Sequence, residues 1–252
     1  MPNSNDLAEE LEKTINEDLG SIAHTIAEGV HIPGDPLQTL DMQAAKIEHQ
    51  LSQCMLLAKT RVRDGFNYSI KAVQELARTD TLINLDALKE NVNVAFSRFD
   101  TVAIAKDMCT KVMEGTSWKT LLGLDDVSME LLYRGAKHLF DLGHHPEAEA
   151  AFFFLTTVDY AQYAFWLGLG HAAFHLGNIN QSINAYEMAS TCQPGSIWPH
   201  IYMANCFEAL HDFEESLICL KAAEQELLNS PDKDQELAID LRERIANARS
   251  KY

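Results

Sequence analysis

The stretch WLGLGHAAFHLGNINQSINAYEMASTCQP, residues 166–194, decides the fold. It contains two apolar segments of helical length, with Gly177 between them and Pro194 at the end. A glycine after an apolar segment can adopt a positive φ and end a helix, and a proline cannot continue one. The stretch therefore predicts two short helices that fold back on each other as a hairpin.

The same pattern recurs on both sides of this stretch with a period of 34 residues. Superimposed without gaps, the three copies agree in residue type at four positions: Gly143, Gly177 and His211; Ala148, Ser182 and Ser216; Phe152, Tyr186 and Leu220; and Leu155, Ala189 and Ala223. Small residues suit the places where two helices approach closely, and large ones fill the space between hairpins. Together with Trp166-x-x-Leu169-Gly170, this is the tetratricopeptide (TPR) pattern.

We therefore predict an all-α fold, an α-solenoid of three TPR hairpins from about Met129 to Leu228. One repeat cannot bury its apolar face alone, so three are expected to stack. After the break at Ser230-Pro231-Asp232, four apolar residues recur at helical spacing among charges: Leu237, Leu241, Ile245 and Ala248. This spacing predicts a C-terminal capping helix with a polar outer face.

The N-terminal half differs in composition. Residues 1–36 contain Gly29, Pro33, Gly34 and Pro36, which predicts a flexible arm. Residues 37–114 form a predicted helical region, with apolar stripes at Ile47–Val62, Phe66–Ala77 and Leu85–Val102. Two interpretations stay open for these stripes: packing on themselves or on the TPR array, or a seam for dimerisation or a partner. The predicted domains are thus 1–36, 37–114, 115–228 and 229–252.

Charge and cysteine content exclude several classes of protein. The chain has 37 acidic and 20 basic residues, a net charge of −17, which makes nucleic acid a poor partner. We find no signal peptide and no uncharged stretch long enough for direct membrane insertion. The five cysteines form no CxxC pair, as expected for reduced thiols in the cytoplasm.

Several short motifs resemble catalytic or cofactor-binding sites but lack the surrounding sequence that such sites need. Gly168-x-Gly170-x-x-Ala173 imitates a dinucleotide-binding loop but lies inside a helical pattern, without the preceding strand that such a loop needs. His171 and His175 have metal-ligand spacing but no third ligand, so we interpret them as a helix-surface pair. His144 and His145 fall in a turn, where solvated side chains are the simpler interpretation. We expect no enzyme activity, no cofactor and no metal.

The concave face is the best candidate site. In TPR arrays, repeat positions 2, 5, 9 and 12 of each first helix line this face. Here these positions hold Glu130, Tyr133, Lys137 and Phe140; Ala164, Leu167, His171 and Phe174; and Trp198, Ile201, Asn205 and Glu208. The predicted client-binding residues are Tyr133, Phe140, Leu167, His171, Phe174, Trp198, Ile201 and Asn205. Such a floor suits an extended segment with apolar anchors, although some of these rings could instead be core between repeats.

The sequence also resembles a known family. The carriers of the resemblance are GTSWKTLLGL (115–124), Leu132-Tyr133, Ala136, Gly143, Glu147-Ala148, Phe152, the LGLG element (167–170), Tyr186 and Ala204-x-Cys206. They are similar to the SycD/LcrH group, the class II chaperones of type III secretion. The resemblance implies a bacterial cytoplasmic, virulence-associated TPR chaperone that binds a hydrophobic translocator or effector protein, often as a homodimer, with groove aromatics at Tyr133 and Phe140.

Two other hypotheses remain from the sequence. One is a general TPR scaffold that joins soluble proteins in a complex. The other makes residues 38–112 the interaction domain and the TPR array its support.

Overall fold

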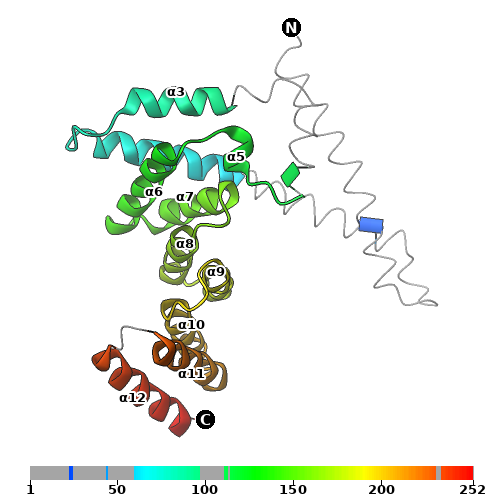
Figure 1. The fold of residues 1–252 in the computed structure, drawn as a ribbon, viewed down its shortest axis with the longest axis vertical. Helices are drawn as coiled ribbons and strands as arrows, with labels where there is room; N and C mark the ends of the chain where they lie inside the picture. Colours follow the sequence, from blue (N-terminus) through cyan, green and yellow to red (C-terminus); the bar gives the residue numbers. More distant parts are fainter. Residues whose placement is uncertain are drawn as a thin grey trace.

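The computed structural model describes residues 23–24, 44, 60–96, 111–112, 114–230 and 234–251. Every regular element within these ranges is a helix, which confirms the predicted all-α class. Figure 1 shows the helices stacked one after another along the long axis, with α3 at one end and α12 at the other. Apart from Ala23, His24 and Ala44, the predicted arm and the chain before residue 60 lie outside the described residues.

Two N-terminal helices form a hairpin. The first is described over residues 60–76 and passes without a break through Asp64-Gly65, and the second is α3, Leu85–Phe96. Between them, the side chain of Asp80 accepts a hydrogen bond from the amide of Leu82 at 3.0 Å. Asn84 accepts from the amide of Ala87 at 3.0 Å, at the start of α3. The predicted stripe through Leu88 and Val92 is buried, and its continuation at Phe99 and Val102 lies outside the described residues.

A short helix, α5 (Trp118–Leu122), leads into the array. Ser117 caps its N-terminus, where its hydroxyl accepts from the amide of Thr120. Gly123 ends it with φ 68°, a left-handed conformation that costs glycine little.

Six helices make up the repeat region, and they pair in chain order, first helix with second. The pairs are α6 (Asp126–Asp141) with α7 (His145–Val158), α8 (Tyr163–His175) with α9 (Ile179–Cys192), and α10 (Trp198–Ala209) with α11 (Phe213–Asn229). The turn of each pair contains a left-handed residue at the same repeat position: Gly143 (φ 80°), Gly177 (φ 76°) and His211 (φ 60°). The 34-residue register of the sequence therefore matches the turns of the structure.

Small residues lie where the helices of a pair approach each other. Ser182 is fully buried, and its hydroxyl donates to the carbonyl of Gly170 at 2.8 Å. The equivalent residues Ala148 and Ser216 are also fully buried. A Cβ placed on Gly170 would lie only 2.7 Å from Cδ1 of Tyr186, so glycine is required for the ring to fit.

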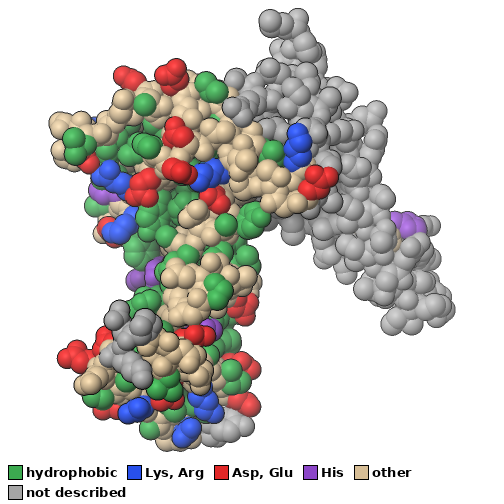
Figure 2. All heavy atoms as spheres, viewed as in Figure 1, with side chains coloured by type: hydrophobic (Ala, Val, Ile, Leu, Met, Phe, Trp, Pro, Cys, Tyr) green, Lys and Arg blue, Asp and Glu red, His purple; other side chains and the backbone are tan. Residues whose placement is uncertain are grey.

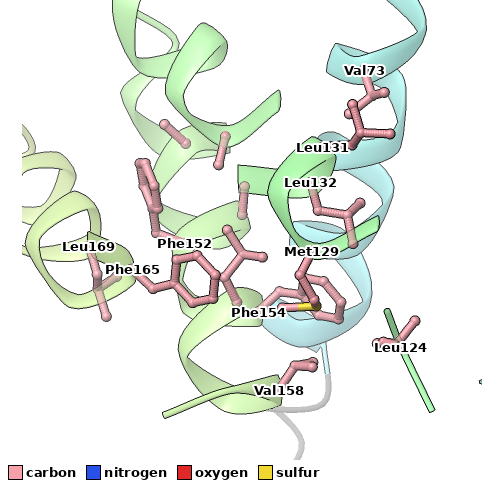
Figure 3. Close-up of a cluster of buried hydrophobic side chains, with 14 of the residues drawn as sticks. Val73, Leu124, Met129, Leu131, Leu132, Phe152, Phe154, Val158, Phe165 and Leu169 are labelled. Carbon is pink, nitrogen blue, oxygen red and sulfur yellow. The ribbon is translucent and has the colours of Figure 1, made fainter. Parts of the chain in front are cut away.

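The core consists of two clusters. The first joins the N-terminal hairpin, α5, α6, α7 and α8, and Figure 3 shows its centre, where Phe152, Phe154 and Phe165 meet side chains of α6. The second joins α9, α10, α11 and the last helix, α12 (Gln235–Lys251). Leu241, Ile245 and Ala248 of α12 are buried against α11, while most of the remaining α12 side chains are exposed.

The N-terminal hairpin packs directly on the array. A Cβ on Gly135 of α6 would lie 2.7 Å from the carbonyl oxygen of Ser69, and one on Gly65 would overlap the backbone of Ala150 in α7. Glu149, which is buried, forms an ion pair with Arg61 and accepts a hydrogen bond from Gln181 of α9. Residues 60–96 are therefore packed on the array, while the division of the chain into four domains stays a prediction.

Candidate functional site

The first helices of the three pairs share a continuous row of rings. Phe140 of α6 lies 6.3 Å from His171 and 5.4 Å from His175, both on α8 (centroid distances). Next along, His171 meets Tyr202 of α10 edge to face at 4.5 Å, and Tyr202 stacks on Trp198 at 6.1 Å. We call these five side chains the aromatic row. It crosses α6, α8 and α10, and so is built by the repeat itself.

A buried tyrosine fixes the middle of the row. The hydroxyl of Tyr186, from α9, lies 2.8 Å from Nδ1 of His171, and its ring lies 5.3 Å from that of Tyr202. Burial raises the pKa of Tyr186 far above its ordinary value, so it stays protonated. Burial, with a smaller effect from His175, lowers the pKa of His171, so this imidazole is neutral at neutral pH. The middle of the row, at His171 and Tyr202, therefore presents uncharged rings.

One end of the row is extended by another histidine. His145, at the first turn of α7, stacks on His175 with ring centroids 4.5 Å apart and planes 16° apart. Its ring is 5.1 Å from that of Phe140, and its Nδ1 is buried without a hydrogen-bond partner. His144 is exposed, as predicted for a turn, whereas His145 is half-buried because it packs against Phe140 and His175. In the predicted surface pair, His175 is exposed and His171 is half-buried, since Tyr186 and Tyr202 contact its ring.

The eight predicted client-binding residues differ in how much side chain they present. Trp198 is 49% exposed and Ile201 only 7%, within the second core cluster. The other six are half-buried: Tyr133, Phe140, Leu167, His171, Phe174 and Asn205. Tyr133 lies 5.6 Å from Phe165 and 6.2 Å from Phe152 (centroid distances), so part of its ring belongs to the core. That the eight together bind a client stays a prediction.

Polar groups close both ends of the row. At the α12 end, Arg244 donates to Asn205 at 2.6 Å and to Glu208 at 3.1 Å, and Ser216 also donates to Glu208 at 3.2 Å. At the other end, Lys137 pairs with Asp141 at 2.8 Å. Figure 2 shows most charged side chains at the upper and lower parts of the molecule, with hydrophobic side chains and histidines visible in the middle. Sequence reasoning missed Arg244, because one arginine among several on a charged helix carries no signal of its own.

The site contains no arrangement that resembles a catalytic or metal centre. The Gly168-x-Gly170-x-x-Ala173 element lies within α8, where a helix and not a strand precedes it. Over the described ranges, no group of three His, Cys, Asp or Glu side chains could hold a metal ion. Within the same ranges, no helix is long and apolar enough to cross a membrane.

No protein-family model matches the sequence, and no curated protein matches it either. Solved structures do match. A chain of a T3SS complex from Aeromonas hydrophila is 21% identical, with TM-score 0.54, over 58% of this chain and 97% of that one. The type III secretion translocator chaperone SycD of Yersinia enterocolitica is 21% identical, with TM-score 0.49, over 53% and 98%.

The same Yersinia enterocolitica chaperone, in complex with a peptide of the translocator YopD, matches at 21% identity and TM-score 0.47, over 51% of this chain and 97% of that one. At about 21% identity, structural similarity shows a shared fold and no more. The TM-score of 0.54 with the Aeromonas hydrophila chain shows that shared fold. The helical repeat fold predicted from the sequence is thus one that also occurs in a type III secretion complex.

Proposed function

We propose that this chain is a non-enzymatic chaperone of type III secretion. It binds an apolar segment of a translocator or effector protein across the aromatic row and keeps that protein soluble and competent for export. The observation that carries the proposal is the row itself: five rings from three successive first helices, between polar ends. Flat rings that stay partly exposed are typical anchors for a protein segment.

The shape and chemistry of the row indicate an extended ligand. Trp198 is half exposed and Phe140 partly so, and they lie at opposite ends of a row that crosses three helices. A segment with spaced apolar side chains can place one at each end while Arg244, Asn205 and Lys137 meet its polar groups. A segment with many carboxylates would find few cations along the row itself.

A translocator is the class of client that needs this protection. A protein that later enters a membrane exposes apolar segments, and these aggregate in water unless they are covered. The net charge of −17 adds solubility to the complex. The similarity of the 115–228 segment to the SycD/LcrH group supports the same conclusion, as does the fold shared with a chain of a T3SS complex. On this proposal the chain acts in the bacterial cytoplasm, and a homodimer is an expected form.

The test is co-expression with neighbouring-gene products that contain long apolar helices, followed by affinity purification. We expect a client that is insoluble alone to be recovered in solution. Phe140→Ala and Trp198→Ala should each weaken its binding by about tenfold, the usual effect of removing an anchor of this kind. Ile218→Ala, an equally exposed apolar residue of α11 outside the row, is the matched control.

Thermal unfolding by circular dichroism must show that the variants stay folded. Recovery of soluble cytosolic proteins alone would favour the general scaffold instead. A client bound equally well by wild type and by both row variants would place the binding site elsewhere, for example on residues 38–112.

A further inference from the structure

A second apolar surface lies at the far end of the array, between α11 and α12. It is a depression with a cavity volume of about 350 Å³. Leu227 and Ala238 form its floor, and Leu228 and Ile239 form its walls. The two wall residues are 52% and 57% exposed, which is high for large aliphatic side chains, and they come from different helices. None of these residues belongs to the aromatic row.

The repeat geometry shows what shape would fill this depression. Helix α12 packs on α11 as α8 packs on α7 and α10 on α9, so it occupies the place of a first helix. The helices α8 and α10 each pack also against the second helix of their own pair. Among the described residues, α12 has no such second helix. Elsewhere in the array a helix in this position is covered by a further helix, so a helix is a fitting occupant for the apolar surface that α12 leaves exposed.

The charges around the depression indicate the character of that helix. Glu224 and Asp234 stand on its rim, and Glu236 and Asp240 are exposed on the same half of α12. Among the described residues that line the depression, the one cation is Arg242, which lies 3.6 Å from Glu224 and is thereby partly neutralised. Asp234 also accepts the amides of Glu236 and Leu237 as the N-cap of α12, which fixes its carboxylate at the rim. The rim is acidic, so it complements lysine and arginine.

We propose that this depression is a docking site for an amphipathic helix of another protein, with an apolar stripe flanked by lysine or arginine. The lining spans residues 224–228 of α11 and 235–242 of α12, about two helical turns. A second copy of this chain fits this surface less well, because the two acidic rims would repel each other. The site would let the chain hold a second protein while the aromatic row holds a client.

The probe is a synthetic helical peptide with leucine at i, i+3, i+4 and i+7 and lysine on both flanks. A second peptide has glutamate in place of every lysine. Binding to the full-length chain is followed by fluorescence anisotropy, and the bound region is located by hydrogen exchange. We expect the lysine peptide to bind, to protect the 224–242 segment, and to weaken with added salt, and the glutamate peptide to bind at least tenfold more weakly.

Variants separate this site from the rest of the surface. Leu228→Arg and Ile239→Arg should each weaken the lysine peptide by about tenfold or more, because they place a like charge in its apolar contact. Glu224→Gln with Asp234→Asn should reduce the salt dependence, and asparagine keeps the cap of α12. Ile218→Arg, on an exposed part of α11 outside the depression, and Phe140→Ala, in the aromatic row, should leave peptide binding unchanged.

Three results would overturn the proposal. One is equal binding of the lysine and glutamate peptides. Another is a lysine peptide that Ile239→Arg leaves unaffected but Phe140→Ala weakens, which would place it on the aromatic row. The third is concentration-dependent dimerisation, seen by light scattering and abolished by Ile239→Arg, which would assign the surface to a second copy of the chain.

Discussion

Replacing Gly170 with alanine tests the packing of a hairpin at its closest point. The added Cβ would lie 2.7 Å from Cδ1 and 2.9 Å from Cζ of Tyr186, and closer still to Cε1. Ordinary carbon–carbon contacts need about 3.5–4.0 Å, so the ring would have to move by roughly 1 Å. Its escape is restricted, because Tyr186 is 2% exposed and its hydroxyl is held by His171.

The expected cost follows from two opposing effects. Overpacking of a core site costs about 1–3 kcal/mol, and replacing glycine by alanine within a helix returns about 1 kcal/mol. We expect Gly170→Ala to lower the free energy of unfolding by up to about 2 kcal/mol in urea denaturation followed by circular dichroism. A leucine at the same position should cost more, because it adds further volume at the same contact.

The neighbouring repeat supplies the compensating change. Ala204 and Leu220 occupy the positions of Gly170 and Tyr186 in the third repeat, and both are fully buried. Tyr186→Leu alone should cost about 1–3 kcal/mol through the space it leaves and the lost hydroxyl bond. Combined with Gly170→Ala it should cost less than the sum of the two by at least about 1 kcal/mol. Additive costs of the two changes would refute the close approach.

Three further changes test other parts of the structure. His211→Gly should stabilise the chain by up to about 1 kcal/mol, because φ is 60° at His211 and its two repeat equivalents are glycines. His211→Ala should give no such gain, and the free energy of unfolding from chemical denaturation distinguishes the two variants. Glu149→Ala should cost about 1–3 kcal/mol, since it removes the partner of Arg61 and Gln181; hydrogen exchange should then increase first in residues 60–76. Burial lowers the pKa of His171 from its ordinary 6.5, so in acid the unfolded chain binds more protons than the folded chain. The stability that neutral His171 provides is therefore complete above about pH 6.5 and decreases as the pH falls below it. His171→Gln should flatten this decrease in urea midpoints measured across pH, and an unchanged slope would mean that His171 is not protected from protonation.

The repeat region was predictable because its signals are local. The glycine at each turn and the small residues at the helix contacts recur every 34 residues, so even one copy, residues 166–194, predicts the hairpin. The sequence also predicted which helices carry the candidate site. It could not predict how exposed each residue is: Ile201 and Trp198 are three positions apart on α10, yet one is buried and the other half exposed. That difference depends on which neighbouring helix covers each side chain.

The burial of His145 and His171 could not be predicted from the sequence either. Histidine in a turn or on a helix is usually solvated, and by that rule His145 and His171 were expected at the surface. The structure places them against Phe140 and Tyr202, on neighbouring helices of the array. A residue in the first turn of α7 meets one at the end of α8 only after the repeats have stacked. No pattern within a single repeat contains that contact.

The N-terminal hairpin covers one of the two ends of the stacked array. A terminal repeat exposes the face that an inner repeat covers, so an end needs a polar cap or a covering element. At the α12 end, α12 covers most of this face and leaves Leu228 and Ile239 exposed. At the α6 end, the helix at residues 60–76 approaches closely at Gly65 and Gly135, two positions at which any side chain would collide. This close fit, joined to the array by the ion pair between Arg61 and Glu149, covers α6 and α7 beside Gly135 and Ala150. The two ends are therefore closed by different means: a tightly packed hairpin at the α6 end and the single helix α12 at the other.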